Sequence, residues 1–238
     1  MVIILTFLGA ILFFLSVMFV QQRTWRIILA TITGLIFVGS TALMTLNYSH
    51  HFGMHKVTTT TTRRIYPVNS QMPLALYQPV GTSGKDDVYI YKTSPHQAKP
   101  QHTQANEYTH SQIKWKQVTN PQLVTTTTRW RYKSNFYKFL YAWSGMDGTL
   151  VKRTNTLEYP RTYVLLTTKQ AKQLQAKAKS AGGQQAQAAA RQQGQAYVTS
   201  RVQAAMTKNP RMTAAQIQTV SQQAEQEFQA KMVRAMLK

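Results

Sequence analysis

The sequence of 238 residues contains no cysteine, and it has only seven Asp and Glu against 28 Lys and Arg. The absence of Cys excludes disulfide bonds, thiolate zinc sites, a Cys nucleophile and lipid-modified Cys. Seven acids leave little material for paired-carboxylate catalysis or a carboxylate-rich metal site. The chain also lacks the G-x-S-x-G, Walker, H-E-x-x-H and G-x-G-x-x-G motifs. We therefore expect a protein that is not an enzyme, with no catalytic, cofactor-binding or metal-binding residues.

Two apolar runs, residues 1–20 and 27–46, contain no ionisable side chain. A helix of 20 residues is about 30 Å long, which matches the hydrocarbon core of a bilayer. Between the runs, Gln21–Arg26 holds a Trp and two Arg, residue types that suit the headgroup layer. We predict two transmembrane helices that anchor the protein in the cytoplasmic membrane. A cleaved signal peptide is the alternative for the first run, but no Lys or Arg precedes it.

The orientation of this hairpin follows from its short loop. Arg23 and Arg26 lie in that loop, so the positive-inside rule places it in the cytoplasm and both termini outside. Lys56, Arg63 and Arg64 follow the second run and act against this assignment. Long domains translocate largely regardless of their charge, so these three receive less weight. We expect a multi-pass protein with two spans and both termini extracytoplasmic.

After a polar connector at residues 47–56, the sequence becomes rich in β-branched and aromatic residues as far as residue 167. Short runs of this kind are separated by Pro, Gly and Asn, a pattern typical of strands and turns. The expected strands are 57–66, 74–80, 87–93, 112–118, 123–133, 136–143, 149–158 and 163–167. We predict a membrane-anchored α+β protein with an antiparallel β-sandwich or barrel.

Two details support strands in this region. The segments Val57–Tyr66 and Val124–Tyr132 resemble each other, because each is a Val, a run of Thr, basic residues and a Tyr. In residues 136–143, aromatic side chains recur at every second position, at 137, 139, 141 and 143. We interpret this alternation as one face of a strand that packs in the core of a sheet.

Residues 168–238 contain 16 Gln and 16 Ala and form a basic tail of helix-favouring composition. We predict helices at about 168–179, 184–208 and 213–237, with breaks at 180–183 and at Asn209-Pro210. Thr167 and Thr213 each precede a Gln by three residues, which is the capping-box spacing. The last helix carries an apolar stripe of Ile217, Val220, Ala224, Phe228, Met232 and Met236. The stripe suits a helical hairpin, a partner helix or a membrane surface.

The order of these parts resembles a family of small membrane proteins of lactic acid bacteria that is described only as a domain of unknown function. The resemblance covers residues 1–175. It lies in the ILFFLSV run of the first apolar segment and in HFGMHKV at His51–Val57, LYQPVGTSGKDDVYIYKT at Leu76–Thr93, TTTTRWRYKSNFYKFL at Thr125–Leu140 and TKQAKQLQ at Thr168–Gln175. The family implies no activity and no catalytic residue. It implies a Gram-positive envelope with a single membrane, where a basic outer body would meet anionic wall polymers.

Beyond residue 46 the net charge is +19, which indicates an anionic partner. The candidate polyanion-binding residues are basic residues of the expected strands: Arg63, Arg64, Lys114, Lys116, Arg129 and Arg131. Three hypotheses remain open. The body lies outside and binds anionic cell-wall polymers or another membrane protein; it faces the cytoplasm and binds nucleic acid or ribosomes; or the chain is an accessory subunit of a transporter or membrane enzyme complex.

Overall fold

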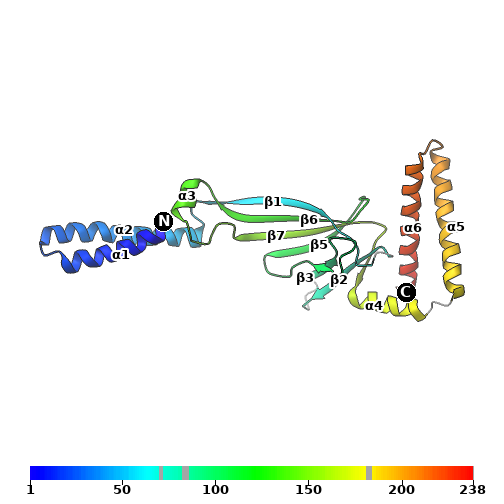
Figure 1. The fold of residues 1–238 in the computed structure, drawn as a ribbon, viewed down its shortest axis with the longest axis horizontal. Coiled ribbons are helices and arrows are strands. Elements are labelled where there is room, and N and C mark those ends of the chain that lie inside the picture. The colour runs from blue at the N-terminus through cyan, green and yellow to red at the C-terminus, as the bar shows by residue number, and fades with distance from the viewer. Residues whose placement is uncertain (70–71, 82–85, 181–183, 238) are drawn as a thin grey trace. The chain divides into compact units, whose positions relative to one another are not determined.

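A computed structural model describes residues 1–69, 72–81, 86–180 and 184–237. The elements follow in the order α1 (Val2–Phe19), α2 (Arg23–His50), β1 (Met54–Arg64), β2 (Leu74–Val80), β3 (Asp86–Tyr91), β4 (Gln101–His102), β5 (Thr109–Lys116), β6 (Gln122–Tyr132), α3 (Asn135–Leu140), β7 (Leu150–Pro160), β8 (Val164–Thr167), α4 (Thr168–Ser180), α5 (Gln184–Lys208) and α6 (Ala214–Leu237) (Figure 1). The chain divides into two compact units. Unit 1 is residues 1–59 and 126–153, and unit 2 is residues 60–125 and 154–238. The expected helix break at 180–183 lies outside the described residues, except for Ser180 at the end of α4.

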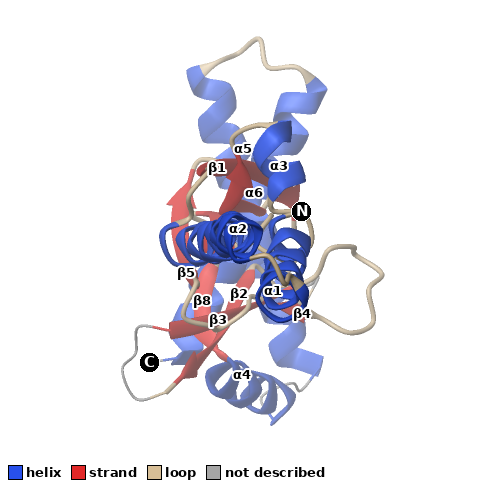
Figure 2. Cartoon of the chain, turned by 90° about the vertical axis from the view of Figure 1, so that its left-hand side faces the viewer, coloured by secondary structure: helices blue, strands red, loops and turns tan. Residues whose placement is uncertain are grey.

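In unit 1, α1 and α2 pack side by side as an antiparallel hairpin (Figure 2). Gly9 allows the close approach, because a Cβ at this position would lie 3.0 Å from the backbone nitrogen of Phe37. The Thr6 hydroxyl donates to the Ser40 hydroxyl at 3.0 Å across the same interface. Most large apolar side chains of the pair are exposed. Because these side chains are exposed, neither helix is a buried core helix. Both helices are also long enough and apolar enough to cross a membrane.

The second helix continues into the sheet through a short, strained turn. α2 ends at His50, and its C-cap residue His51 adopts a left-handed conformation with φ 53°. Gly53 follows with φ 78°, and a Cβ there would lie 2.4 Å from a ring atom of Tyr137. The Asn47 side-chain amide donates to the Phe52 carbonyl at 2.9 Å and closes the turn. Only glycine fits position 53, because a side chain would meet both the positive φ and the ring.

The strands form two four-stranded sheets with orders β1-β6-β7-β5 and β4-β3-β2-β8. The two segments that resemble each other in sequence are the neighbours β1 and β6, and the hydroxyls of Thr58 and Thr128 bond at 2.9 Å between them. The α+β class and the pair of sheets are as expected, but no barrel forms among the described residues. The sheets are also not purely antiparallel, because β2 and β8 run parallel, with Leu74 opposite Val164.

The parallel pairing has a topological cause. β7 ends at Pro160, and the backbone N–H of Tyr163 bonds to the Pro160 carbonyl at 3.0 Å in the turn that follows. The chain crosses there from the first sheet to the second, so β8 reaches β2 from another layer rather than through a hairpin. The first sheet is mixed as well. Hydrogen bonds join Ser111 to Asn155 and Gln112 to Thr156, so the partners advance in the same direction along β5 and β7.

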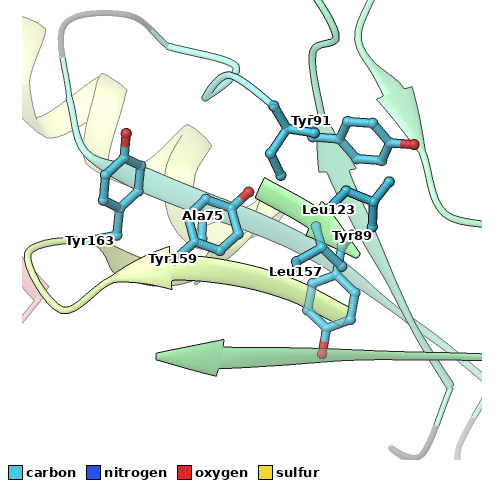
Figure 3. Close-up of a cluster of buried hydrophobic side chains, with 8 residues drawn as sticks. Ala75, Tyr89, Tyr91, Leu123, Leu157, Tyr159 and Tyr163 are labelled. Carbon is cyan, nitrogen blue, oxygen red and sulfur yellow. The ribbon is translucent and has the colours of Figure 1, made fainter. Parts of the chain in front are cut away.

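Unit 2 has three layers around two apolar cores. The first core lies between the sheets and includes Ile65 and Leu157, both fully buried, and the ring of Tyr159 (Figure 3). Complete burial of one Leu or Ile stabilises a fold by about 1.5–3 kcal/mol. The second core packs the outer face of β2 and β8 against α4 and α6, with Leu174 and Val233 at its centre. The C-terminal helix is therefore docked on the second sheet.

The tail helices begin and end close to the predicted residues. The side-chain oxygen of Gln170 accepts from the backbone N–H of Thr167 at 2.9 Å, and the Thr167 hydroxyl accepts from the Gln170 N–H at 3.1 Å. Thr213 and Gln216 form the same reciprocal pair at 2.9 Å and 3.3 Å. Both predicted capping boxes are confirmed. In the α5–α6 hairpin, Phe228 packs against Gly194, so part of the apolar stripe lies between these two helices.

The strand predicted at residues 136–143 is wrong, because this segment forms the short helix α3 and a turn. Ser134 precedes the helix in extended conformation, as N-cap residues do. Tyr141, four residues after Tyr137, is buried and stacks on Tyr132 at a centroid distance of 5.9 Å. Helical spacing places the two Tyr inward, whereas Phe139 and Trp143 are exposed. The aromatics at positions 137, 139, 141 and 143 thus do not share one core face.

Candidate polyanion-binding surface

β5 is an edge strand with one apolar and one basic face. Ile113 packs against the core between the sheets, and the ring of Trp115 lies 6.4 Å from that of Tyr159. Lys114 and Lys116 alternate with these residues and are exposed. The strand predicted at 112–118 is confirmed as β5. The alternation results from the period of two of a strand, which turns consecutive side chains to opposite faces.

Lys116 is exposed but forms an ion pair with a buried acid. Its ammonium forms an ion pair with Glu158 on the neighbouring strand β7, and Glu158 is only 5% exposed. The side-chain amide of Gln122 donates to the other carboxylate oxygen at 2.6 Å. The hydrogen bond from Lys116, followed by that from Gln122, lowers the pKa of the Glu158 carboxyl, and burial opposes them. Lys114 acts on Glu158 only through its charge, so its exposed ammonium is available to a ligand.

The end of β1 carries the next two candidates. The guanidinium of Arg64 donates to the side-chain oxygen of Asn120 at 2.7 Å and lies 5.1 Å from the ring centroid of Tyr66. Arg63 is exposed, and its charge acts on buried Tyr91. Burial raises the pKa of the Tyr91 hydroxyl, and the positive charge of Arg63 opposes that rise. Arg64 is therefore held by local partners, whereas Arg63 resembles Lys114 in its exposure.

The last two candidates, Arg129 and Arg131 on β6, belong to unit 1 and hold a turn. Arg129 donates to the carbonyl of Gly148 at 2.6 Å. Arg131 forms an ion pair with Asp147 at 3.2 Å. Both side chains thus fasten the turn before β7. The six candidates divide into four residues of unit 2 and two of unit 1, and Lys114 and Arg63 have the exposed charges least committed to local contacts.

Sequence reasoning missed one basic–aromatic group of unit 1. The ring of Trp130 on β6 stacks on His51 at 4.1 Å, and the ammonium of Lys56 lies 5.2 Å from the Trp130 centroid. The resemblance between the two Val-Thr segments gave no signal for this group, because the strands pair antiparallel, with Lys133 beside Gly53 and Ile65 beside Pro121, and their basic ends lie apart. His51 is part of this stack. Within the described residues, no three His, Asp or Glu lie close enough together to hold a metal ion.

Comparison with known proteins gives one match. A profile of the family described as a domain of unknown function (DUF4811) matches residues 22–174, which is more than half of the chain. The matched region runs from the residue before α2 into α4, so it includes both sheets. Searches of curated proteins and of solved structures found no match. The match agrees with the resemblance seen in the sequence and assigns no activity.

Proposed function

The chain belongs to the DUF4811 family of domains of unknown function, and we propose that it is a non-enzymatic membrane protein that binds anionic envelope polymers. The α1–α2 hairpin is its anchor in the cytoplasmic membrane, since both helices match a bilayer in length and apolarity. Arg23 and Arg26, in the first turn of α2, keep this end of the hairpin in the cytoplasm, so both termini and the basic β-domain lie outside.

The exposed basic face of β5 is the main observation that supports this proposal. Lys114 and Lys116 lie on one face of an edge strand, and Glu158 is the acid that pairs with Lys116. The whole chain has a net charge of +21, so its field attracts polymers that carry repeated phosphates. Salt screens such attraction over about 10 Å at 0.1 M ionic strength, so the expected binding weakens as salt is added.

Membrane topology is the first property to test. Because the chain has no native cysteine, an introduced cysteine is the one thiol available for labelling. Ser94→Cys places a thiol on the β-domain, and Thr24→Cys places one in the first turn of α2, at the end of the hairpin where the two helices are joined; both positions are exposed. Intact cells are treated with a membrane-impermeant maleimide, and lysed cells serve as the control. Labelling of position 94 alone supports an outside body. Labelling of position 24 alone refutes it.

Binding is tested by removing one charge at a time. Lys114→Gln and Lys172→Gln change the net charge equally, but Lys172 lies on α4, away from the β5 face. Purified full-length protein in mild detergent is mixed at low salt with cell-wall fragments, either complete or stripped of phosphate polymers. We expect Lys114→Gln to reduce retention on complete fragments more than Lys172→Gln does. Equal retention of the two variants would refute the assignment of polymer binding to the basic face of β5.

The Trp130 stack supports a second candidate function. Aromatic rings beside basic residues are typical of single-strand nucleic-acid binding, and Lys56 lies beside this ring. A body facing the cytoplasm would make nucleic acid or ribosomes the partner, so the same labelling experiment decides between the two functions. A role as accessory subunit of a transporter or membrane enzyme complex requires a stoichiometric partner. Co-purification in mild detergent tests for it.

A further inference from the structure

Three large aromatic side chains project from unit 1 in the segment 136–143. Phe136 is 65% exposed, Phe139 is 60% exposed and Trp143 is 73% exposed. The same segment turns Tyr137 and Tyr141 inward. The segment thus has an inner face that packs against the unit and an outer face of aromatic rings. Large exposed aromatic side chains grouped in one short segment favour contact with another apolar or interfacial phase.

Contacts within unit 1 fix this segment beside one end of the helical hairpin. The N-terminal ammonium of Met1 donates to the carbonyl of Phe139 at 3.4 Å. The Thr6–Ser40 hydrogen bond sets the antiparallel register of the helices, so Met1 lies level with the end of the apolar run 27–46. The outer rings therefore lie at the height where both apolar helices leave a bilayer core of about 30 Å.

The turn after α2 holds the segment from its other side. The rings of Phe52 and Tyr137 meet edge to face at 5.9 Å, and the N–H of Lys133 donates to the carbonyl of Gly53 at 2.9 Å. Around the rings, Tyr48 on α2 and Lys138 on α3 are also exposed. Trp and Tyr are enriched at membrane interfaces, and Lys side chains reach from that depth to lipid phosphates.

Trp143 gives an independent indication. Its φ is 69°, in the left-handed region that bulky residues rarely adopt. The turn is held there, because the Tyr132 hydroxyl bonds the Ser144 hydroxyl at 2.7 Å and the Ser144 N–H donates to the Tyr141 carbonyl at 3.1 Å. A water-facing turn with this conformation favours Gly or Asn. An exposed Trp at this position makes physical sense if its ring enters an environment outside the chain.

We propose that residues 136–143 form a second membrane contact. Phe136, Phe139 and Trp143 insert into the headgroup–acyl boundary of the leaflet that holds the N-terminus of α1 and the C-terminus of α2. The partner is lipid, because the rings lie level with the ends of two apolar helices and have Lys138 beside them. The inference rests on the proposed anchor, and it adds that the near end of β6 and β7 is fixed to the bilayer surface.

Quenching by brominated lipids tests this contact in the full chain. A variant that keeps Trp143 and carries Phe at the other three Trp positions is reconstituted into vesicles of phosphatidylcholine and phosphatidylglycerol. The acyl chains carry bromine either near the headgroup or near the chain end. We expect blue-shifted emission and a loss of about half of it with bromine near the headgroup, since interfacial Trp rings lie at that depth. Red-shifted emission that neither lipid quenches would overturn the proposal.

Matched variants separate failure of this inference from failure of the anchor. A variant with Trp25 alone reports the first turn of α2 and is expected to be quenched. Thr59→Trp as the only Trp lies about 17 Å further along β1 than Met54, and is expected to be unquenched. Quenching at Trp25 without quenching at Trp143 overturns the second contact only, whereas no quenching at either overturns the anchor too. Phe136→Ser with Phe139→Ser is expected to reduce quenching of Trp143, and unchanged quenching argues against insertion of the whole face.

Discussion

Gly53→Ala should destabilise unit 1 far more than an ordinary turn substitution. Gly53 has φ 78°, and an added Cβ would lie 2.4, 2.8 and 2.9 Å from three ring atoms of Tyr137. A side chain in the left-handed region costs about 1–2 kcal/mol. Forcing a methyl group into a packed ring costs about 1–3 kcal/mol more. We therefore expect a loss of about 2–5 kcal/mol in the free energy of unfolding of this unit.

Gly145→Ala is the matched control, because it carries the conformational cost alone. Its φ is 74°, and no atom lies within 4 Å of the added Cβ. The expected loss is about 1–2 kcal/mol. Urea unfolding of the full chain in mild detergent measures both, with Trp130 as the only Trp. This ring is a suitable reporter, since it stacks on His51 at 4.1 Å beside the substituted turn.

Equal losses in the two variants would refute the reasoning, because the ring contact would then have no energetic effect. A double-mutant cycle sharpens the comparison. In a Tyr137→Ala background the ring is absent, so Gly53→Ala should cost no more than Gly145→Ala. If the full cost of Gly53→Ala persists in that background, its cause is not the contact with Tyr137.

Two further predictions concern the helix pair and the buried acid. Gly9→Leu should separate α1 from α2, and the measurement is the loss of a disulfide bond between Thr6→Cys and Ser40→Cys. Gly39→Leu is the control and should keep this disulfide bond, because no atom lies within 4 Å of a Cβ added at Gly39. Glu158 has a lowered pKa in the folded state, so it contributes stability above its unfolded pKa of about 4.3 and loses it as pH falls through the lower folded value. Glu158→Gln should make the melting temperature depend less on pH in the acid range. An unchanged dependence on pH would contradict the ion pair between Lys116 and Glu158.

Local patterns in the sequence predict most elements of this fold. The apolar runs predict the hairpin, and the Thr–Gln spacing predicts the start of α4 and α6. The run of strand-favouring residues at 112–118 predicts β5, in which Ile113 packs against the core and Lys114 is exposed. Each of these signals is contained within one element, where 3.6-residue or two-residue periodicity decides which side chains are buried.

Segment 136–143 could not be assigned in this way, because its pattern fits two structures. Aromatics at 137, 139, 141 and 143 alternate as in a strand, but Tyr137 and Tyr141 also have the i, i+4 spacing of a helix face. Eight residues are too few for periodicity to decide. Packing decides instead, because Tyr141 stacks on Tyr132, and Tyr137 contacts Gly53 from a distant part of the chain.

Non-local pairings set a similar limit for the candidate surface. Lys116 is a candidate polyanion-binding residue, and β7 brings Glu158 beside it. Arg129 and Arg131 are also candidates, and Gly148 and Asp147 each accept a hydrogen bond from one of their guanidinium groups. Strand order determines these partners, and no pattern within one strand reveals it.

The junction between α2 and β1 also has a mechanical consequence. Only residues 51–53 separate the helix from the strand. Their backbone is bonded on both sides, from the Phe52 N–H to the Leu46 carbonyl at 3.2 Å and from the Lys133 N–H to the Gly53 carbonyl at 2.9 Å. A junction of this kind has none of the slack of a flexible linker. A tilt of α2 therefore also changes the direction of the first residues of β1, which begins at Met54.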